Sequence, residues 1–168
     1  VIINLAQDWR GFASGSLISF AIDDFIANGK IDKLNVVYQP DDKSSVENIG
    51  TTQSKVLISI YRDVTGAAYE FDWDGENWTS YKLDFPENGS VSIDSSDTKE
   101  DIAFISSESF LIPETLYMYN TKTGKKTAAK SLPSWFDAST MVSEQFFASS
   151  TDGTKVPYFV VRQKNIEL

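Results

Sequence analysis

The amino-acid sequence predicts an all-β protein, namely an incomplete β-propeller of about two to three four-stranded antiparallel blades that ends in a β-hairpin. Two observations support this prediction. Short strand-like segments alternate with turn residues along the chain, and related patterns recur about every 45 to 49 residues. Repeats of roughly 40 to 50 residues, each with several short strands, are typical of propeller blades. With 168 residues, 41% of them hydrophobic, the chain is long enough to form one domain with a core.

The clearest recurrence is an aromatic residue followed three positions later by an aspartate or an asparagine. It occurs in Phe20–Asp23, Tyr69–Asp72 and Tyr117–Asn120, so the two steps are 49 and 48 positions. The last two copies are each followed by a glycine-containing turn and a further strand-like segment. Each copy is therefore expected at the same place in a different blade.

A second pattern, Ser45-Val46, returns as Ser90-Val91 after 45 positions. The two patterns together predict complete blades near residues 44–88 and 89–133, preceded by the end of another blade. A closed propeller ring needs at least about four blades to protect its strand edges. We therefore expect the open edges to be covered by another part of the same protein or, through self-association, by a second copy of the chain.

The individual segments agree with this architecture. The chain begins with a strand-like segment, Val1–Leu5, as if cut from something longer. Val56–Tyr61 and Ile102–Ile105 are nearly continuous apolar runs, which is typical of strands covered on both faces. Tyr69–Asp74 alternates aromatic and acidic residues, as a strand with one apolar and one polar face does. Turn residues separate the strands at positions 74–77, 87–90, 122–125 and 152–153.

One short helix is predicted before the first complete blade. Asp23 is expected to cap its N-terminus, and Gly29 is expected to end it. Phe25 and Ile26 are expected to face inward.

The last segment, residues 142–168, is predicted to form a hairpin that turns at Asp152-Gly153. Both of its faces are apolar, which is an aggregation hazard in an exposed terminal strand. We therefore expect this hairpin to lie against another part of the protein or another copy. Alternation gives one face Val156, Tyr158 and Val160 and the other face Pro157, Phe159 and Val161.

Composition excludes several classes of function. The net charge is −9, with 24 acidic and 15 basic residues, and this balance repels nucleic-acid phosphates and anionic lipid headgroups. The chain has no cysteine, so it forms no disulfide and no thiolate metal site. No apolar run approaches the roughly 20 residues of a membrane-spanning helix. We expect a soluble protein, and bacterial cytoplasm and periplasm both remain open as its compartment.

The residues needed for common catalytic chemistry are missing. The sequence has no histidine and no Gly-x-Ser-x-Gly nucleophile elbow, and in Gly11–Gly15 the serine is displaced by one position. Acidic residues are paired in several places, but we expect them to serve turns and solvation. We therefore predict no catalytic, cofactor-binding or metal-binding residue in this chain. The acidic pairs are Asp23-Asp24, Asp41-Asp42, Asp72 with Asp74, and Glu100-Asp101.

Four segments in the second half of the chain resemble the prolyl oligopeptidase family. They are Phe104–Tyr117, Phe136–Ser139, Val142–Gln145 and Ser150–Phe159, and they are similar to the end of that family's β-propeller and the start of its α/β-hydrolase domain. Residues 9–62 are similar to the later propeller blades of bacterial members.

The resemblance implies a division of the chain and a role for each part. Residues 1–141 would be propeller blades, and residues 142–168 would begin the catalytic domain. In this family a seven-bladed propeller covers the active site, admits short peptides and excludes folded proteins, and a Ser-His-Asp triad cleaves after proline. The partners implied are the catalytic domain of the same protein and short proline-containing peptides. Without a histidine, this chain is expected to be inactive alone.

Two rival interpretations remain open. In the first, the chain is a free-standing propeller-like module that binds a peptide or a glycan. In the second, it is a structural fragment that assembles only with the rest of its protein. Some tryptophan and arginine side chains bear on the choice, because they are candidates for a binding groove, for packing between blades or for ion pairs across a domain interface. Trp135 is the tryptophan expected to pack on the hydrolase domain. The other candidates are Trp9, Trp73, Trp78, Arg10, Arg62 and Arg162.

Overall fold

The computed structural model describes residues 1–166, which form thirteen strands and one helix, so the last two residues of the predicted 142–168 segment lie outside the described part. The first elements are β1 (Ile2–Asn4), β2 (Leu17–Ser19), α1 (Ile22–Asn28) and β3 (Asn35–Tyr38). The next four strands are β4 (Ser44–Thr51), β5 (Val56–Arg62), β6 (Thr65–Trp73) and β7 (Trp78–Lys82). The remaining strands are β8 (Gly89–Ser96), β9 (Ile102–Ser109), β10 (Thr115–Asn120), β11 (Lys125–Ser131), β12 (Met141–Ser149) and β13 (Lys155–Gln163).

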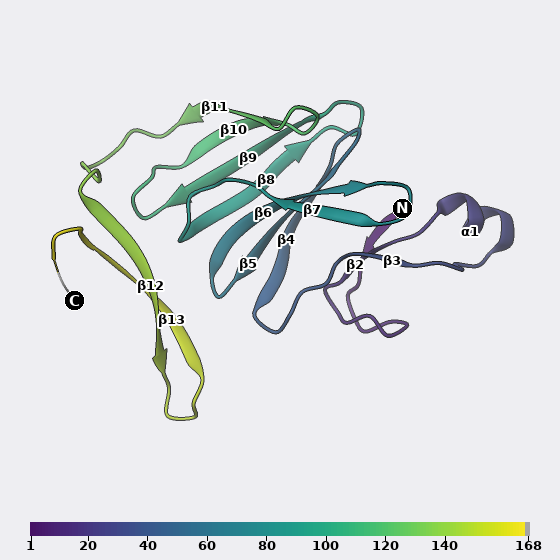
Figure 1. Cartoon of the computed structure of the whole chain (residues 1–168), viewed down its shortest axis with the longest axis horizontal. Coiled ribbons are helices and arrows are strands. Elements are labelled where there is room, and N and C mark those ends of the chain that lie inside the picture. The colour runs from purple at the N-terminus through teal and green to yellow at the C-terminus, as the bar shows by residue number, and fades with distance from the viewer. Residues whose placement is uncertain (167–168) are drawn as a thin grey trace.

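These strands form four antiparallel sheets (Figure 1). Strands β4 to β7 form one four-stranded sheet and β8 to β11 form another, each with its strands in chain order. The three-stranded sheet β1-β2-β3 precedes them, and the hairpin β12-β13 follows. The two predicted blades and the end of a preceding one are confirmed, as is the terminal hairpin.

The two blades pack together through β8, which contacts β4, β5 and β6 of the middle blade. Strands β7 and β11 are at the opposite edges of their sheets from β4 and β8, and β11 lies at the outer edge of the molecule in Figure 1. This arrangement is that of adjacent propeller blades around an axis, with β4 and β8 as the inner strands.

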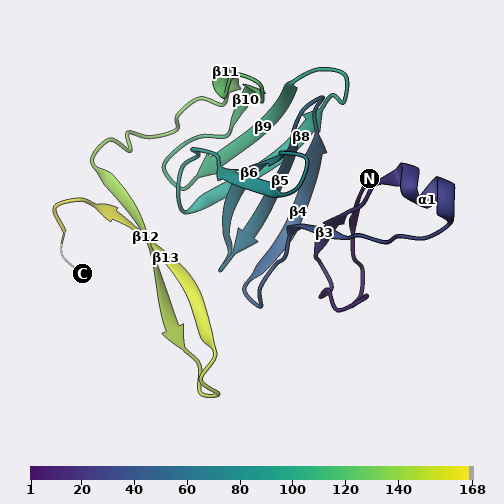
Figure 2. The ribbon, with the colours of Figure 1, turned by 45° about the vertical axis from the view of Figure 1, so that its right-hand side comes forward.

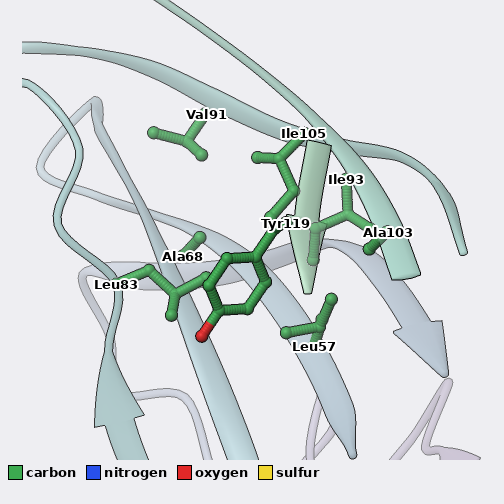
Figure 3. Close-up of a cluster of buried hydrophobic side chains, with 8 residues drawn as sticks. All are labelled: Leu57, Ala68, Leu83, Val91, Ile93, Ala103, Ile105 and Tyr119. Carbon is green, nitrogen blue, oxygen red and sulfur yellow. The ribbon is translucent and has the colours of Figure 1, made fainter. Parts of the chain in front are cut away.

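Two hydrophobic clusters hold the three sheets together, one on each side of the middle blade. Leu57 contributes to the cluster shared with the β8–β11 blade, and its neighbour Ile58 contributes to the cluster shared with the β1–β3 sheet. Both side chains are fully buried, which explains the continuous apolar run in β5. Figure 3 shows the first cluster, made of Leu57, Ala68, Leu83, Val91, Ile93, Ala103, Ile105 and Tyr119.

The β8–β11 blade is covered on one face only within the described residues. Ala103 and Ile105 of β9 are buried against the middle blade, whereas Phe104 and Met118 on the opposite face are 36% and 40% exposed. The expectation that the Ile102–Ile105 run is covered on both faces is therefore wrong for this part of the protein, because no neighbouring blade packs on the second face.

The helix forms where it was predicted, but its details differ. It begins at Ile22 after an extended Ala21, with no side-chain cap, so Asp23 lies in the first turn and is not the N-cap. Gly29 ends the helix in the left-handed conformation, as expected. Phe25 and Ile26 do not face inward, since they are 43% and 74% exposed. The helix sits at the edge of the molecule in Figure 1, and none of its side chains is buried within residues 1–166.

Candidate functional site: the junction of the blades and the hairpin

The hairpin meets the blades at one end of the two four-stranded sheets. In Figures 1 and 2 it lies beside the ends where β5 turns into β6 and where β9 leads to β10. The opposite ends of the blades, with the β6–β7 turn, lie near the helix and the N-terminus. The hairpin turns at Asp152-Gly153 as predicted, and Gly153 adopts φ +87°, which glycine tolerates without strain.

Within residues 1–166, two hydrogen bonds and an aromatic contact attach the hairpin to the blades. The side-chain amide of Gln145 donates a 2.6 Å hydrogen bond to the Asp63 carbonyl in the β5–β6 turn. The side-chain amide of Asn88 donates a 2.8 Å hydrogen bond to the Ser143 carbonyl in β12. The rings of Phe110 and Phe159 pack with centroids 5.1 Å apart. One face of the hairpin is thus held on the propeller.

Two cavities lie at this junction. One, of about 360 Å³, is lined by residues of both blades together with Phe159 of the hairpin. The other, of about 910 Å³, is more open and lies between the β5–β6 turn, the start of β4 and the hairpin residues Thr154, Lys155 and Pro157. Val64 lines both cavities. The hairpin therefore touches the blades at a few points with open space between them.

The other face of the hairpin is apolar and open. Phe146 and Tyr158 stack there with centroids 5.8 Å apart, and Tyr158 and Val156 are 46% and 49% exposed. Arg162 forms a 2.7 Å ion pair with Glu144 on the same face. A cluster of exposed apolar side chains adjoins the hairpin, from the β9–β10 loop and the segment after β11; its members are Phe110, Ile112, Leu132, Trp135 and Phe136. Exposed apolar surfaces of this kind mark interaction sites.

The paired acidic residues serve turns and neighbouring strands. Asp74 accepts hydrogen bonds from the backbone of Asn77 and Glu76, and these bonds lower the pKa of its carboxyl group. Asp72 forms an ion pair with Lys55, and the Asp101 carboxylate accepts hydrogen bonds from Ser54 of the preceding blade. Within residues 1–166 no three histidine, cysteine or acidic side chains group closely enough to hold a metal ion.

Asp41 illustrates how such a carboxylate is held. The Ser44 hydroxyl donates to it, and Arg62 forms a 2.6 Å ion pair with it. The Ser44 hydrogen bond, together with Arg62, lowers the pKa of Asp41. Arg62 therefore pairs within its own blade, and Arg162 pairs within the hairpin. Arg10 lies over the Trp9 ring and donates to the Ile31 carbonyl, so none of the three arginines forms an ion pair between the blades and the hairpin.

The tryptophans divide into two groups. Trp78 donates from its indole nitrogen to Ser19 of the preceding sheet at 2.8 Å and contacts Trp73, with centroids 5.3 Å apart, so this pair takes part in blade packing. Trp135 is 85% exposed in the segment that leads to the hairpin. That exposure leaves its ring free to contact another domain.

The residues that join the hairpin to the blades have no distinctive signal in the sequence. Asn88 lies in a predicted turn, and Gln145 lies in a segment that resembles the family. Neither residue type is unusual in its position. Their contacts depend on elements that lie far apart in the sequence, Asn88 being 55 positions from Ser143 and Gln145 being 82 from Asp63.

Two adjacent four-stranded blades, a partial third one and a following hairpin define this protein as a segment of a β-propeller. The family profile for the prolyl oligopeptidase N-terminal β-propeller domain matches residues 4–131. The chain therefore belongs to the prolyl oligopeptidase family.

Individual relatives agree with this assignment. An uncharacterised peptidase of Sinorhizobium fredii, y4nA, is 36% identical to this chain. The alignment covers 98% of this chain and 23% of that protein. A prolyl endopeptidase of Elizabethkingia meningoseptica is 27% identical to this chain. The alignment covers 71% of this chain and 17% of that enzyme. The solved structure of a post-proline cleaving enzyme from Rickettsia typhi is 30% identical and superposes with a TM-score of 0.76, covering 99% of this chain and 25% of that one. The chain thus spans about a quarter or less of the relatives it matches.

Proposed function

We propose that this chain is the part of a prolyl oligopeptidase-like serine peptidase in which the propeller blades meet the catalytic domain and restrict access to short peptides. The observation that carries this proposal is the two-sided hairpin. One face lies on the blades through Gln145 and Phe159, and the other presents Phe146 and Tyr158 to a further partner. On this proposal residues 1–141 belong to the propeller and residues 142–168 begin the α/β-hydrolase domain.

The exposed apolar surface supports a catalytic domain as the partner. Trp135 and Phe136 lie beside the hairpin, and both are more than half exposed. Burying such aromatic side chains contributes much of the energy of an interface. A hydrolase domain that continues from the hairpin would cover this surface together with the hairpin's open face.

The chain itself supplies steric and structural functions rather than bond cleavage. It has no histidine to act as the general base of a serine triad, so the triad must come from elsewhere in the protein. Its relatives include a prolyl endopeptidase and a post-proline cleaving enzyme, which supports short proline-containing peptides as substrates. Access would be limited along the inner strands β4 and β8.

The gating role is tested with the complete gene product. Ser45 on β4 and Ser95 on β8 are exposed along the inner edge of the blades, and tryptophan at either position should narrow a passage along the propeller axis. We expect Ser45→Trp to slow the hydrolysis of proline-containing peptides of about ten residues. The rate of hydrolysis of a proline-linked dipeptide reporter should stay unchanged. Thr79→Trp, at an exposed site on the outer strand β7, is the control. Equal effects of both changes on both substrates would exclude gating by this edge.

A binding module for a peptide or glycan is the second candidate. Trp73, Trp78 and Phe20 line a cavity of about 420 Å³ together with the polar residues Asp24, Lys33 and Asn35. Aromatic rings with nearby polar groups suit proline rings or sugars. Titration of tryptophan fluorescence with a proline-rich peptide and with an oligosaccharide tests this role. Saturable quenching that Trp73→Ala removes would favour the binding module, and no response to either ligand would reject it.

A further inference from the structure

A separate cavity lies between the middle blade and the segment that connects this blade to the next one. Its volume is about 240 Å³. Pockets for drug-sized ligands measure roughly 300–1,000 Å³, so this cavity suits a smaller molecule. Ile60, Ala67 and Tyr69 of β5 and β6 form one wall, and the connecting segment, residues 83–88, forms the other. We call this space the linker cavity.

The connecting segment is held in place by contacts with both blades. The Leu83 amide donates a 2.8 Å hydrogen bond to the Ala68 carbonyl of β6. The Phe85 ring packs on Tyr117 of β10 with centroids 5.5 Å apart. The Lys126 ammonium group of β11 lies 4.3 Å from the centre of the Phe85 ring and also donates a hydrogen bond to the backbone of the segment. The wall is therefore formed before a ligand binds, which reduces the free-energy cost of binding.

The lining of the linker cavity carries equal numbers of positive and negative side chains. They are Arg62, Lys82, Asp63 and Glu87. Arg62 is already engaged, because it forms the ion pair with Asp41. Lys82 and Glu87 form no ion pair within residues 1–166, so both of their charges are available to a ligand. A ligand that carries one charge of each sign matches this lining better than an ion of a single sign.

The rest of the lining combines a free hydrogen-bonding group with an apolar surface. The Thr65 hydroxyl is buried and has no hydrogen-bond partner among residues 1–166. An unpaired buried hydroxyl is destabilising, and a ligand that bonds to it removes part of this penalty. The apolar surface favours a ligand with hydrocarbon groups over an inorganic salt. Its members are Ile60, Ala67, Leu83, Phe85 and Pro86.

We propose that the linker cavity binds a zwitterionic dipeptide, which has a free ammonium group and a free carboxylate. Lys82 pairs with the carboxylate, and Glu87 pairs with the ammonium group. The side chains of the dipeptide contact the apolar wall around Phe85. Binding itself rests on this cavity. A role as a site for products rests on the proposed function, because cleavage after proline releases fragments with free termini.

The site is tested by titrating the isotope-labelled chain with alanylproline and following its amide chemical shifts by nuclear magnetic resonance. We expect saturable shifts in the segment around Phe85, with a Kd of about 1 mM, as is usual for so small a ligand. Absence of saturable shifts in this segment would overturn the site. Saturable shifts centred on Trp73 and Trp78 would also overturn it, because they place the dipeptide in a different cavity.

Each charge pair is tested by removing one partner at a time. Amidation of the dipeptide's carboxyl group should weaken binding to the parent about tenfold, and it should make little difference to Lys82→Ala. Acetylation of the dipeptide's amino group should weaken binding to the parent by a similar factor, and it should make little difference to Glu87→Gln. Equal affinity of the parent for the charged and the blocked dipeptides would contradict both assignments.

The matched controls remove the same charges at exposed positions in other turns. Lys99 lies in the β8–β9 turn and Glu76 lies in the β6–β7 turn, and neither lines the linker cavity. Lys99→Ala and Glu76→Gln should keep the affinity of the parent and its dependence on both ligand charges. If these controls weaken binding as much as the changes at Lys82 and Glu87 do, the site is wrong.

The role as a product site is tested with the complete gene product. Fragments that it releases from proline-containing peptides should bind the chain with the same dependence on Lys82 and Glu87. Binding of synthetic alanylproline without binding of these fragments would overturn the product role. If the complete protein cleaves no proline-containing peptide, the proposed function itself fails, and the titration of the chain still decides whether the linker cavity binds dipeptides.

Discussion

The hydroxyl of Tyr119 in β10 donates a 2.8 Å hydrogen bond to the Glu70 carboxylate in β6, and this bond joins the two blades. Both residues belong to the recurring pattern found in the sequence, Glu70 in Tyr69–Asp72 and Tyr119 in Tyr117–Asn120. The Tyr119 ring is 5% exposed and lies in the cluster between the blades (Figure 3). Residues of the repeat therefore contribute to the apolar packing and form a polar contact between the two blades.

Removing the Tyr119 hydroxyl should destabilise the contact between the blades. Tyr119→Phe keeps the buried ring but leaves the half-buried Glu70 carboxylate without this donor, so we expect a loss of about 1–2 kcal/mol in the free energy of unfolding. Urea unfolding followed by circular dichroism measures it. Tyr81→Phe, whose ring is 65% exposed, is the control and should change stability by less than about 0.5 kcal/mol. Similar losses in both variants would contradict the interblade role.

The same residue should make stability depend on alkaline pH. Burial, and then the Glu70 carboxylate, raise the pKa of Tyr119 above its usual value of 10.0. A pKa raised by folding contributes stability that is complete below the unfolded pKa and declines as the pH rises toward the folded value. We expect the parent to lose stability from about pH 10 upward more steeply than Tyr119→Phe does. Parallel pH profiles for the two proteins, measured by urea unfolding, would show that Tyr119 does not titrate in this way.

The middle blade should be the most sensitive part of the core. Leu57 is fully buried between two blades, so Leu57→Ala should leave a cavity and lower the free energy of unfolding by about 2–5 kcal/mol. Ile49 on the inner strand β4 is 42% exposed, so Ile49→Ala should lower the free energy of unfolding much less than Leu57→Ala does. Calorimetric melting of both variants tests this ranking, and a reversed order would contradict it.

The hairpin should be separable from the blades. Phe159 packs on Phe110 at the junction and contributes to neither cluster between the blades. Phe159→Ser should therefore loosen the hairpin from the blades and leave the unfolding midpoint of the blades nearly unchanged. Limited proteolysis of the hairpin and thermal melting of the chain measure the two effects. Loss of the whole fold would instead make Phe159 part of the propeller core.

The isolated chain should hydrolyse no prolyl-peptide substrate, because it has neither a histidine nor a nucleophile elbow. Incubation with a chromogenic proline-linked reporter tests this expectation. Release of the chromophore that a serine-directed inhibitor blocks would show that another catalytic arrangement is present.

Much of the blade architecture was predictable from local sequence. The apolar run of β5, the alternation of Tyr69–Asp74 and the turn at Asp152-Gly153 all predict strands and hairpins that the structure confirms. The helix at residues 22–28 was also predicted, but the prediction that Phe25 and Ile26 face inward is wrong. Which face of a helix is buried depends on what lies next to it, and none of this helix's side chains is buried within residues 1–166.

The sequence by itself determined the repeat, the number of blades and the lack of a complete catalytic triad, because side-chain periodicity, turn chemistry and residue identity are local properties. Only the tertiary structure decided which side chains join the elements. Tyr119 reaches Glu70, Asn88 reaches Ser143, and Gln145 reaches Asp63, across separations of 49, 55 and 82 residues. Such contacts depend on how whole sheets pack and on which turns face the hairpin. A polar side chain in a strand or turn has the same local pattern whether it faces water or a distant carbonyl group.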